Sequence, residues 1–375
     1  MKKRLNIQNA TNAMEAAGLT QTAVAEQLSV SKEAVSQWLK EKSFPRPNKL
    51  LQFAKILKLG FSELVINEEP NAPVIAFRKK AGTKTKNHHV EKAQETGRFL
   101  RHLVPYLPFE TLEMPPVLKS PTCDYEYLCQ VTSKVRKDIN LDETETVDFE
   151  HLIRRFSELQ AVVVPVLWGT KNRHENAIHI HLPDSKTTWV YLNLDTNIHD
   201  FKFWMAHELG HCLSPSLSGN EAEDFADDFA GALLFPKALA ENAYREILSQ
   251  QTSPSKINKV LDIADNYFIS PYTVLGQVNK YAKFAQLPEI KLSKSFFGAV
   301  TNFNKKFNNL STALLGDISE LDAKQFIDET KEAFKTPFFD ILKQYLKEEN
   351  KGAGFVQVVT DMPLLDARSI HSELT

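Results

Sequence analysis

One pentapeptide has the clearest capacity for chemistry in this chain: His207-Glu208-Leu209-Gly210-His211. On a helix, its four-residue spacing places His207 and His211 one turn apart on one face, within reach of a single metal ion. Glu208 lies about 100° around the helix, where its carboxylate can contact a water on that metal. The pattern predicts a zinc hydrolase that cleaves peptide bonds, with two histidine ligands and Glu208 as the general base.

The surrounding sequence predicts two helices that hold this motif. Residues from about 200 to 214 are largely apolar, with Asp200 at the expected N-cap. The next helix spans residues 221–234 and offers several carboxylates as a third metal ligand. These are Glu221, Glu223, Asp224, Asp227 and Asp228.

We choose Glu223 as the third ligand because it directly precedes an apolar stripe that would face the core. Asp227 follows one turn later, where it can accept a hydrogen bond from a ligand histidine. A solvated acidic helix face is the alternative interpretation of these carboxylates.

These two helices resemble the ImmA/IrrE family of metallopeptidases. AHELGH at 206–211 is followed by EDFADDFAGALLFP from Glu223 to Pro236. The family pairs an HExxH helix with a downstream pattern E-x-x-A-(N/D)-x-F-A-x-x-L-(L/M)-x-P, which this chain matches at every specified position. Trp204 departs from the small polar residue usual in the family, and it is not a catalytic position. The resemblance implies a zincin-like domain, Zn²⁺ as cofactor with Mn²⁺ as an alternative, and Glu223 as a ligand.

Three short β-branched segments upstream predict a small sheet beside the metal helix. They cover residues 161–168, 177–182 and 188–194, bounded by Pro, Gly, Asn or Asp. We interpret Trp189 to Asn193 as an edge strand that could pair with an extended substrate.

Four polar residues near this sheet need separate interpretation. His179 and His181 alternate with apolar residues, so we place them on the polar face of a half-buried strand, away from metal binding. Tyr191 and His199 are candidate hydrogen-bond donors to the oxyanion that forms during peptide hydrolysis.

The N-terminal part carries a second, independent pattern of four or five short helices between Ile7 and Leu64. Thr20 and Ser31 are natural N-caps of two successive helices, and Ala25 is small where those helices would cross. The stretch resembles the Xre-type helix-turn-helix family over roughly its first 65 residues. The expected core consists of Leu28, Val30, Val35, Leu39, Leu51, Ala54, Ile56 and Leu57.

The helix-turn-helix resemblance implies double-stranded DNA as a partner. At the matching positions, Gln21 would meet a phosphate at its helix N-terminus, and Lys32, Glu33, Ser36 and Gln37 would face the major groove. Such modules usually read paired half-sites, so we expect a homodimer. A helical module for protein interaction is the alternative.

Charge is distributed unevenly along the chain. Residues 1–101 contain 18 Lys+Arg against 9 Asp+Glu, and the remainder contains 27 against 38. A basic N-terminal part suits phosphate contact. We interpret the later portion of this basic part, beyond the helical module, as a solvated linker, with additional phosphate contacts as the alternative. The basic residues there are Arg78, Lys79, Lys80, Lys84, Lys86, Lys92, Arg98 and Arg101.

Composition bounds the class of protein. No apolar run approaches 18 residues and no signal-peptide pattern follows Met1, so we expect a soluble, cytoplasmic protein without membrane partners. The three cysteines, at 123, 129 and 212, form no CxxC pair, which argues against disulfide or structural-zinc scaffolding. We expect Cys212 to pack within its helix.

The sequence therefore predicts a multidomain, mainly α chain with a small β-sheet. We expect a helix-turn-helix bundle at 1–68, a basic linker and helical connector at 69–140, and an α+β metallopeptidase domain at 141–245. A helix-turn-helix-like element at 246–290 and a helical C-terminal region of unknown role at 291–375 follow, the latter with a short strand from Phe355 to Val359.

Two functions compete on this sequence. In the first, the chain is a DNA-binding zinc endopeptidase that cleaves a repressor or another regulatory protein. In the second, it is a transcriptional regulator whose peptidase-like domain senses a ligand or partner without proteolysis. The glutamate of the motif favours the first, because a purely structural metal site has no use for it.

Overall fold

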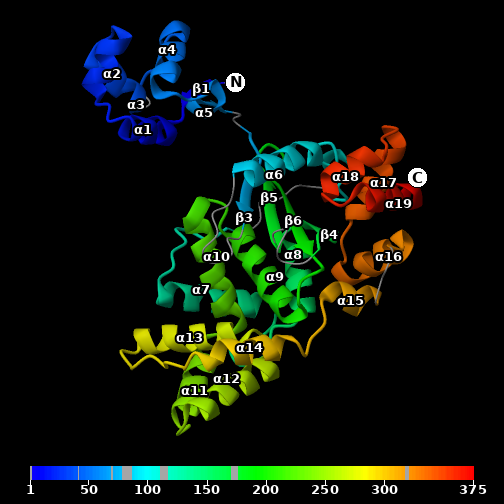
Figure 1. The fold of residues 1–375 in the computed structure, drawn as a ribbon. Helices are drawn as coiled ribbons and strands as arrows, with labels where there is room; N and C mark the ends of the chain where they lie inside the picture. The colour runs from blue at the N-terminus through cyan, green and yellow to red at the C-terminus, as the bar shows by residue number, and fades with distance from the viewer. Residues whose placement is uncertain are drawn as a thin grey trace. The chain divides into compact units, whose positions relative to one another are not determined.

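The computed structural model describes residues 2–40, 42–68, 71–77, 87–109, 117–169, 176–316 and 321–375. The chain divides into two compact units, Met1–Ala72 and Pro73–Thr375 (Figure 1). It is mainly helical with a small mixed sheet, which confirms the fold class at this level. No helix of the described residues is both long and apolar enough to cross a membrane.

The first unit is a bundle of short helices with a two-stranded sheet. Its helices are α1 (Ile7–Ala16), α2 (Gln21–Leu28), α3 (Lys32–Leu39), α4 (Pro47–Leu57) and α5 (Phe61–Leu64), and β1 (Lys2–Leu5) pairs antiparallel with β2 (Val65–Glu68). The side chains of Thr20 and Ser31 accept hydrogen bonds from the backbone N–H groups three residues on, which confirms both N-caps.

The core of this bundle differs from the prediction on α4. Leu51 is 61% exposed, whereas Leu50 and Phe53 are buried. Together with Ala54 and Leu57 they form the i, i+3, i+4, i+7 face of the helix, which leaves Leu51 on the solvent side. The other predicted core residues are buried or packed against the core.

The second unit is built around a four-stranded sheet in the order β3-β5-β6-β4. The strands are β3 (Val74–Phe77), β4 (Ala161–Val166), β5 (Ala177–Leu182) and β6 (Thr187–Asn193), with β4 parallel to β6 and the other pairs antiparallel. The three predicted strands are confirmed, and β3 is an addition.

The prediction that Trp189 to Asn193 form an edge strand is wrong. β6 lies between β5 and β4, and all seven of its residues are buried. A strand covered on both faces has no polar alternation to distinguish it, and only pairing partners far along the chain reveal its place. The edges are β3 and β4.

Different helices cover the two faces of this sheet (Figure 1). α9 (Ile198–Leu213) packs on one face, against β5 and β6. On the other face, the Tyr191 hydroxyl donates to the carbonyl of Val359 at 2.6 Å, and the Trp168 indole donates to Thr360 at 2.9 Å. Both acceptors belong to α18 (Ala353–Thr360).

The predicted strand from Phe355 to Val359 is therefore a helix. It buries Val356, Val359 and Thr360, which share one helical face at i, i+3 and i+4. β-branched residues in a short apolar run favoured a strand in the sequence, but packing against the sheet overrides that preference.

The basic stretch after residue 77 is only partly covered. Arg78, Lys79, Lys80, Lys84 and Lys86 lie outside the described residues. Residues 87–100 form α6, which buries Ala93 and Leu100 and places Gly97 against Ile180 of β5. Lys92 and Arg101 form ion pairs with Asp361 and Asp184. Residues 87–101 thus belong to the second unit, as β3 does, and the linker interpretation is wrong for them.

The remaining helices complete the second unit. They are α7 (Tyr125–Asp138), α8 (Phe149–Glu158), α10 (Gly219–Leu234), α11 (Lys237–Leu248), α12 (Ser253–Tyr267), α13 (Pro271–Phe284), α14 (Ser295–Asn304), α15 (Leu310–Leu315), α16 (Ala323–Phe334), α17 (Phe338–Glu348) and α19 (Leu364–Leu374). Their buried residues share one hydrophobic core with α9 and the sheet.

α12 and α13 repeat the turn geometry of α2 and α3, as the prediction of a helix-turn-helix-like element requires. Phe268 has φ 51° and ψ 52°, and Ser29 has φ 50° and ψ 52°. Each is followed by an apolar residue and a serine N-cap, Ser270 in one turn and Ser31 in the other.

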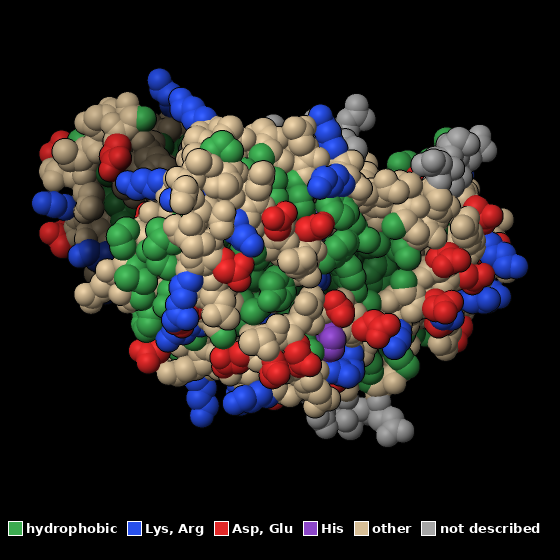
Figure 2. Space-filling view, turned by 90° about the horizontal axis from the view of Figure 1, so that it is seen from below, with side chains coloured by type: hydrophobic (Ala, Val, Ile, Leu, Met, Phe, Trp, Pro, Cys, Tyr) green, Lys and Arg blue, Asp and Glu red, His purple; other side chains and the backbone are tan. Residues whose placement is uncertain are grey.

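α13 nevertheless carries other residue types than α3 at the matching positions. The positions that match Lys32, Glu33, Ser36 and Gln37 in the first unit are occupied by Pro271, Tyr272, Leu275 and Gly276. Figure 2 views the second unit from the side of α11 to α14, and hydrophobic side chains gather there among charged ones. In these helices Tyr272 is 47% and Phe297 62% exposed.

Candidate metal centre

The HExxH motif lies in the C-terminal half of α9 and is enclosed by protein. The helix is capped by Asn197, whose side chain accepts from the backbone N–H of His199, and the predicted cap Asp200 lies in the first turn instead. His207, Glu208 and His211 are at most 4% exposed. Buried polar side chains of this kind need partners or a ligand to offset the loss of water.

A close crossing of two helices brings the third candidate ligand to the motif. A Cβ atom at Gly210 would lie 3.1 Å from the Cα of Ala226 and 3.1 Å from the Phe229 ring. Glycine at the centre of the motif therefore lets α10 approach α9 closely. Glu223, three residues before Ala226 on α10, consequently reaches the two histidines.

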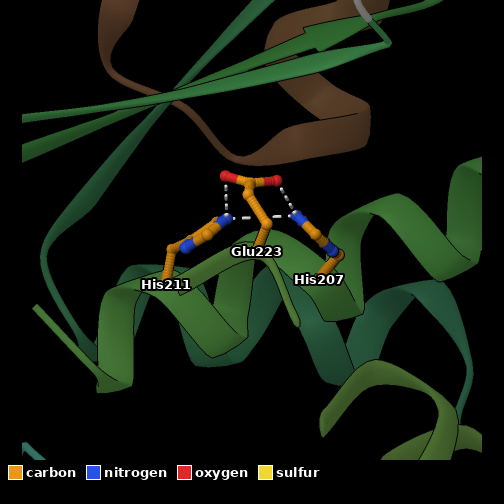
Figure 3. A group of neighbouring side chains, drawn as sticks. All are labelled: His207, His211 and Glu223. Carbon is orange, nitrogen blue, oxygen red and sulfur yellow. Dashed lines mark hydrogen bonds and ion pairs between the residues drawn. The ribbon is translucent and has the colours of Figure 1, made fainter. Parts of the chain in front are cut away.

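Three side chains converge on one point (Figure 3). The Nε2 atoms of His207 and His211 lie 3.0 Å apart. The Glu223 carboxylate oxygens lie 3.6 Å from Nε2 of His207 and 3.5 Å from Nε2 of His211. Ligands about 2.0–2.2 Å from a tetrahedral zinc are separated by roughly 3.2–3.6 Å. The two carboxylate distances match this separation, and the two Nε2 atoms are slightly closer, so a small outward shift of the imidazoles would let the set hold one ion.

The chemistry of the donor set fits zinc as well. Two imidazoles and one carboxylate make a three-ligand set typical of catalytic zinc sites, which keep one position open. Among the described residues, the group of ligand atoms within 4.8 Å of one another comprises these three side chains alone. One Glu223 carboxylate oxygen, Oε2, is buried without a hydrogen-bond partner, as expected of an atom reserved for a cation.

Asp227 fixes the orientation of His207. Its Oδ1 atom lies 2.9 Å from Nδ1 of His207. A carboxylate at this distance holds the proton on Nδ1, which leaves the lone pair of Nε2 directed at the shared point. The remaining carboxylates of α10 are elsewhere, since Glu221 and Asp224 are exposed and Asp228 pairs with Lys280 of α13.

The electrostatics of the group favour a positive charge between the carboxylates. Burial alone would lower the pKa of His207, but its hydrogen bond with Asp227 and the nearby Glu223 carboxylate raise it to about 9. Burial, together with the neighbouring His207, lowers the pKa of His211 well below its usual value. The site thus favours one positive charge, on His207, and disfavours protonation of the second histidine, His211. A divalent cation would interact with both neutral imidazoles at once.

Glu208 lies beside the ligands and outside their set. Burial, with the nearby Glu223 carboxylate as a further contribution, raises its pKa to about 8. Its Oε2 atom is buried without a hydrogen-bond partner. A carboxyl group with a pKa near neutrality can both accept and release a proton, which suits a general base that later acts as an acid.

The two candidate oxyanion donors do not reach the site, and this prediction is wrong. Tyr191 pairs with Ile178 across the sheet and so projects from the face opposite α9. His199 lies two turns before the motif, where its ring packs against Phe268, Phe303 and Phe307. The alternation of side chains along β6 turns Tyr191 away from the candidate metal ligands, and two turns of α9 separate His199 from them.

His199 instead predicts a pH effect on stability. Burial lowers its pKa to about 4, although Asp200 and Asp265 partly offset this. The unfolded chain, with a histidine pKa near 6.5, therefore binds a proton more readily, and stability is lost as the pH falls from about 6.5 towards 4. We expect a His199→Leu variant to lose less stability over this range than the wild type, by on the order of 3 kcal/mol.

The measurement is the unfolding midpoint of both proteins at several pH values between 7 and 4. Parallel curves for the two would contradict a buried neutral His199.

His179 is the site residue that the sequence interpretation missed. It is buried, its Nδ1 atom lies 3.9 Å from Oε2 of Glu208, and its ring centroid lies 5.6 Å from that of His211. The polar face of β5, which alternation predicted correctly, is covered by α9 and does not face solvent. Cys212 packs in the same place, with Sγ 3.9 Å from Nδ1 of His179. His181 is half-buried, with Nδ1 3.2 Å from the hydroxyl of Thr188.

In the first unit, the predicted DNA-contacting side chains lie on α2 and α3. Lys32, Glu33 and Gln37 on α3 are exposed, and Ser36 is half-buried on the same helix. Gln21, at the first position of α2, is half-buried. Backbone N–H groups at such a helix start are available to a phosphate.

Residues 12–64 match the model of the helix-turn-helix family. The match covers α2, α3 and the turn between them, and it supports a DNA-binding regulator. It ends well before the metal group of the second unit. No curated protein and no solved structure matches the chain.

Proposed function

We propose that this chain is a DNA-binding zinc endopeptidase that cleaves a regulatory protein such as a repressor. The observation that supports it best is the convergence of His207, His211 and Glu223 on one point with Glu208 beside them. The match of residues 12–64 supports the DNA-binding part. The ImmA/IrrE resemblance of α9 and α10 agrees with this proposal.

In the proposed site, His207, His211 and Glu223 hold Zn²⁺, or Mn²⁺ as an alternative, and Asp227 orients His207. The bound ion would supply Lewis acidity, polarising the scissile carbonyl and activating water. Glu208 removes a proton from the attacking water and delivers it to the leaving amine. Burial of the site excludes bulk water and strengthens these interactions.

The test is cleavage of a protein from the chain's own host. Purified protein is stripped of metal, reloaded with Zn²⁺ or Mn²⁺, and incubated with host extract, and new N-termini are identified by mass spectrometry. A fragment that appears only with the reloaded protein supports a peptidase. If loaded and metal-free protein give the same fragments, the chain is a regulator without proteolysis.

The proposed DNA contacts make a separate prediction. Gln37 is exposed on α3, where its amide can bond to a base edge, so Gln37→Ala should weaken binding to a selected operator by about 1–3 kcal/mol. The operator is first selected from random duplexes with the wild-type protein, and affinities are then measured at fixed salt. Gln8→Ala is the matched control, because Gln8 on α1 is exposed and bonds to Asn12. Equal losses for both variants would contradict base contact by Gln37.

A further inference from the structure

We propose that His179 is a positioning residue of the candidate active site, which donates a hydrogen bond from Nδ1 to the Glu208 carboxylate and keeps that carboxylate out of the metal ligand set. This inference rests on the proposed function. It assigns a role to a histidine that comes from strand β5 rather than from either metal helix.

The first support is the position of His179 on the sheet. It pairs with Val190 of β6, and its side chain projects from the face that α9 covers. Its imidazole is buried against the ring of His211, with the ring centroids 5.6 Å apart and an interplanar angle of 46°. This contact fixes the imidazole beside the motif.

The second support is an unsatisfied acceptor. Oε2 of Glu208 is fully buried and lacks a hydrogen-bond partner, and the Nδ1 atom of His179 lies 3.9 Å from it. In the ionised form that can take a proton from water, the Glu208 carboxylate only accepts hydrogen bonds, so it needs a donor at this position. A rotation within the flexible glutamate side chain can close the gap, and hydrogen bonds in unliganded active sites often tighten when substrate binds.

Cys212 is the competing partner, since its Sγ atom also lies 3.9 Å from Nδ1 of His179. A thiol is a weak hydrogen-bond acceptor, whereas a carboxylate forms shorter and stronger charge-assisted bonds. Nδ1–H therefore favours Glu208. Held in this way, Glu208 stays beside the ion, where it can take a proton from water, and does not become a fourth protein ligand.

The test uses Co²⁺ as a spectroscopic probe bound to the full chain. Four proteins form a cycle: wild type, His179→Leu, Glu208→Gln, and the double variant. We expect His179→Leu to release the Glu208 carboxylate towards the ion, which raises the coordination number and lowers the visible absorbance of bound Co²⁺. In the Glu208→Gln background, the same substitution should leave the spectrum unchanged.

Conservative replacements and a matched control separate position from packing. The amide of asparagine can place a donor where Nδ1 lies, whereas that of glutamine reaches the position of Nε2. His179→Asn should therefore keep the wild-type spectrum, and His179→Gln should behave like His179→Leu. His181→Leu is the control, because His181 lies on the same face of β5 and contacts Thr188 instead. On a host substrate, His179→Leu should lose roughly 10- to 100-fold in cleavage.

Two results would overturn the inference. One is an equal spectral change on His179→Leu in both backgrounds, since His179 would then act on the metal ligands directly. The other is an unchanged spectrum in every His179 variant. A wild-type chain that takes up no Co²⁺ would instead refute the proposed metal site, so the two failures are distinguishable.

Discussion

A Glu208→Gln protein should bind one zinc ion per chain as the wild type does, yet cleave its substrate about 10²–10⁴-fold more slowly. Glutamine keeps the size of the side chain but can neither accept a proton from water nor carry one to the leaving amine. Glu208 is also buried and outside the ligand group of His207, His211 and Glu223, so the substitution spares metal binding. Metal content by mass spectrometry and fragment formation in host extract measure the two properties.

This substitution separates the two candidate functions. A regulator that uses its metal site only to sense a ligand would keep its activity on DNA and show no fragment with either protein. A Glu208→Gln protein that cleaves at the wild-type rate would remove Glu208 from the mechanism. His207→Ala is the complementary variant, because it should lose both zinc and cleavage.

The local parts of the site were predictable because helical periodicity fixes them. The spacing of His207 and His211 places both side chains on one face of α9. The apolar stripe of α10 likewise set the phase of its helix, which put Glu223 on the inner side and left Glu221 exposed. Asp227 follows Glu223 by one turn and lies 2.9 Å from His207. These relations depend only on residues close in sequence.

The predictions that were wrong depend on which helix and strand surfaces pack against each other in the fold. Alternation along β5 showed that His179 and His181 share a polar face, but not that α9 covers this face. β6 is buried along its whole length, which concealed that it has a neighbouring strand on each side. Tyr191 projects from the sheet face opposite α9, and only the register of β6 with β5 shows this. A strand pairing between residues distant in sequence has no local signature, whereas a cap or a helical stripe does.

Replacing Glu223, the proposed third metal ligand, gives the other large expected effect. Removing the Glu223 carboxylate takes away one of three protein ligands, so Glu223→Ala should weaken zinc binding by more than the roughly 10- to 100-fold that loss of an orienting partner costs. Its oxygens lie 3.5 and 3.6 Å from the two imidazoles, and its removal leaves only His207 and His211 to hold the ion. Competition with a chromophoric chelator measures the affinity.

Glu221→Ala provides the matched control for this prediction. Glu221 lies on the same helix only two residues earlier, carries the same charge, and is exposed to solvent. The two variants change net charge and helix propensity equally, and only Glu223 reaches the histidines. A large loss for Glu223→Ala together with wild-type affinity for Glu221→Ala would therefore identify direct coordination. Equal, small losses in both would mean that α10 contributes only a diffuse negative field, and the site would then lack the third ligand that a hydrolytic zinc centre requires.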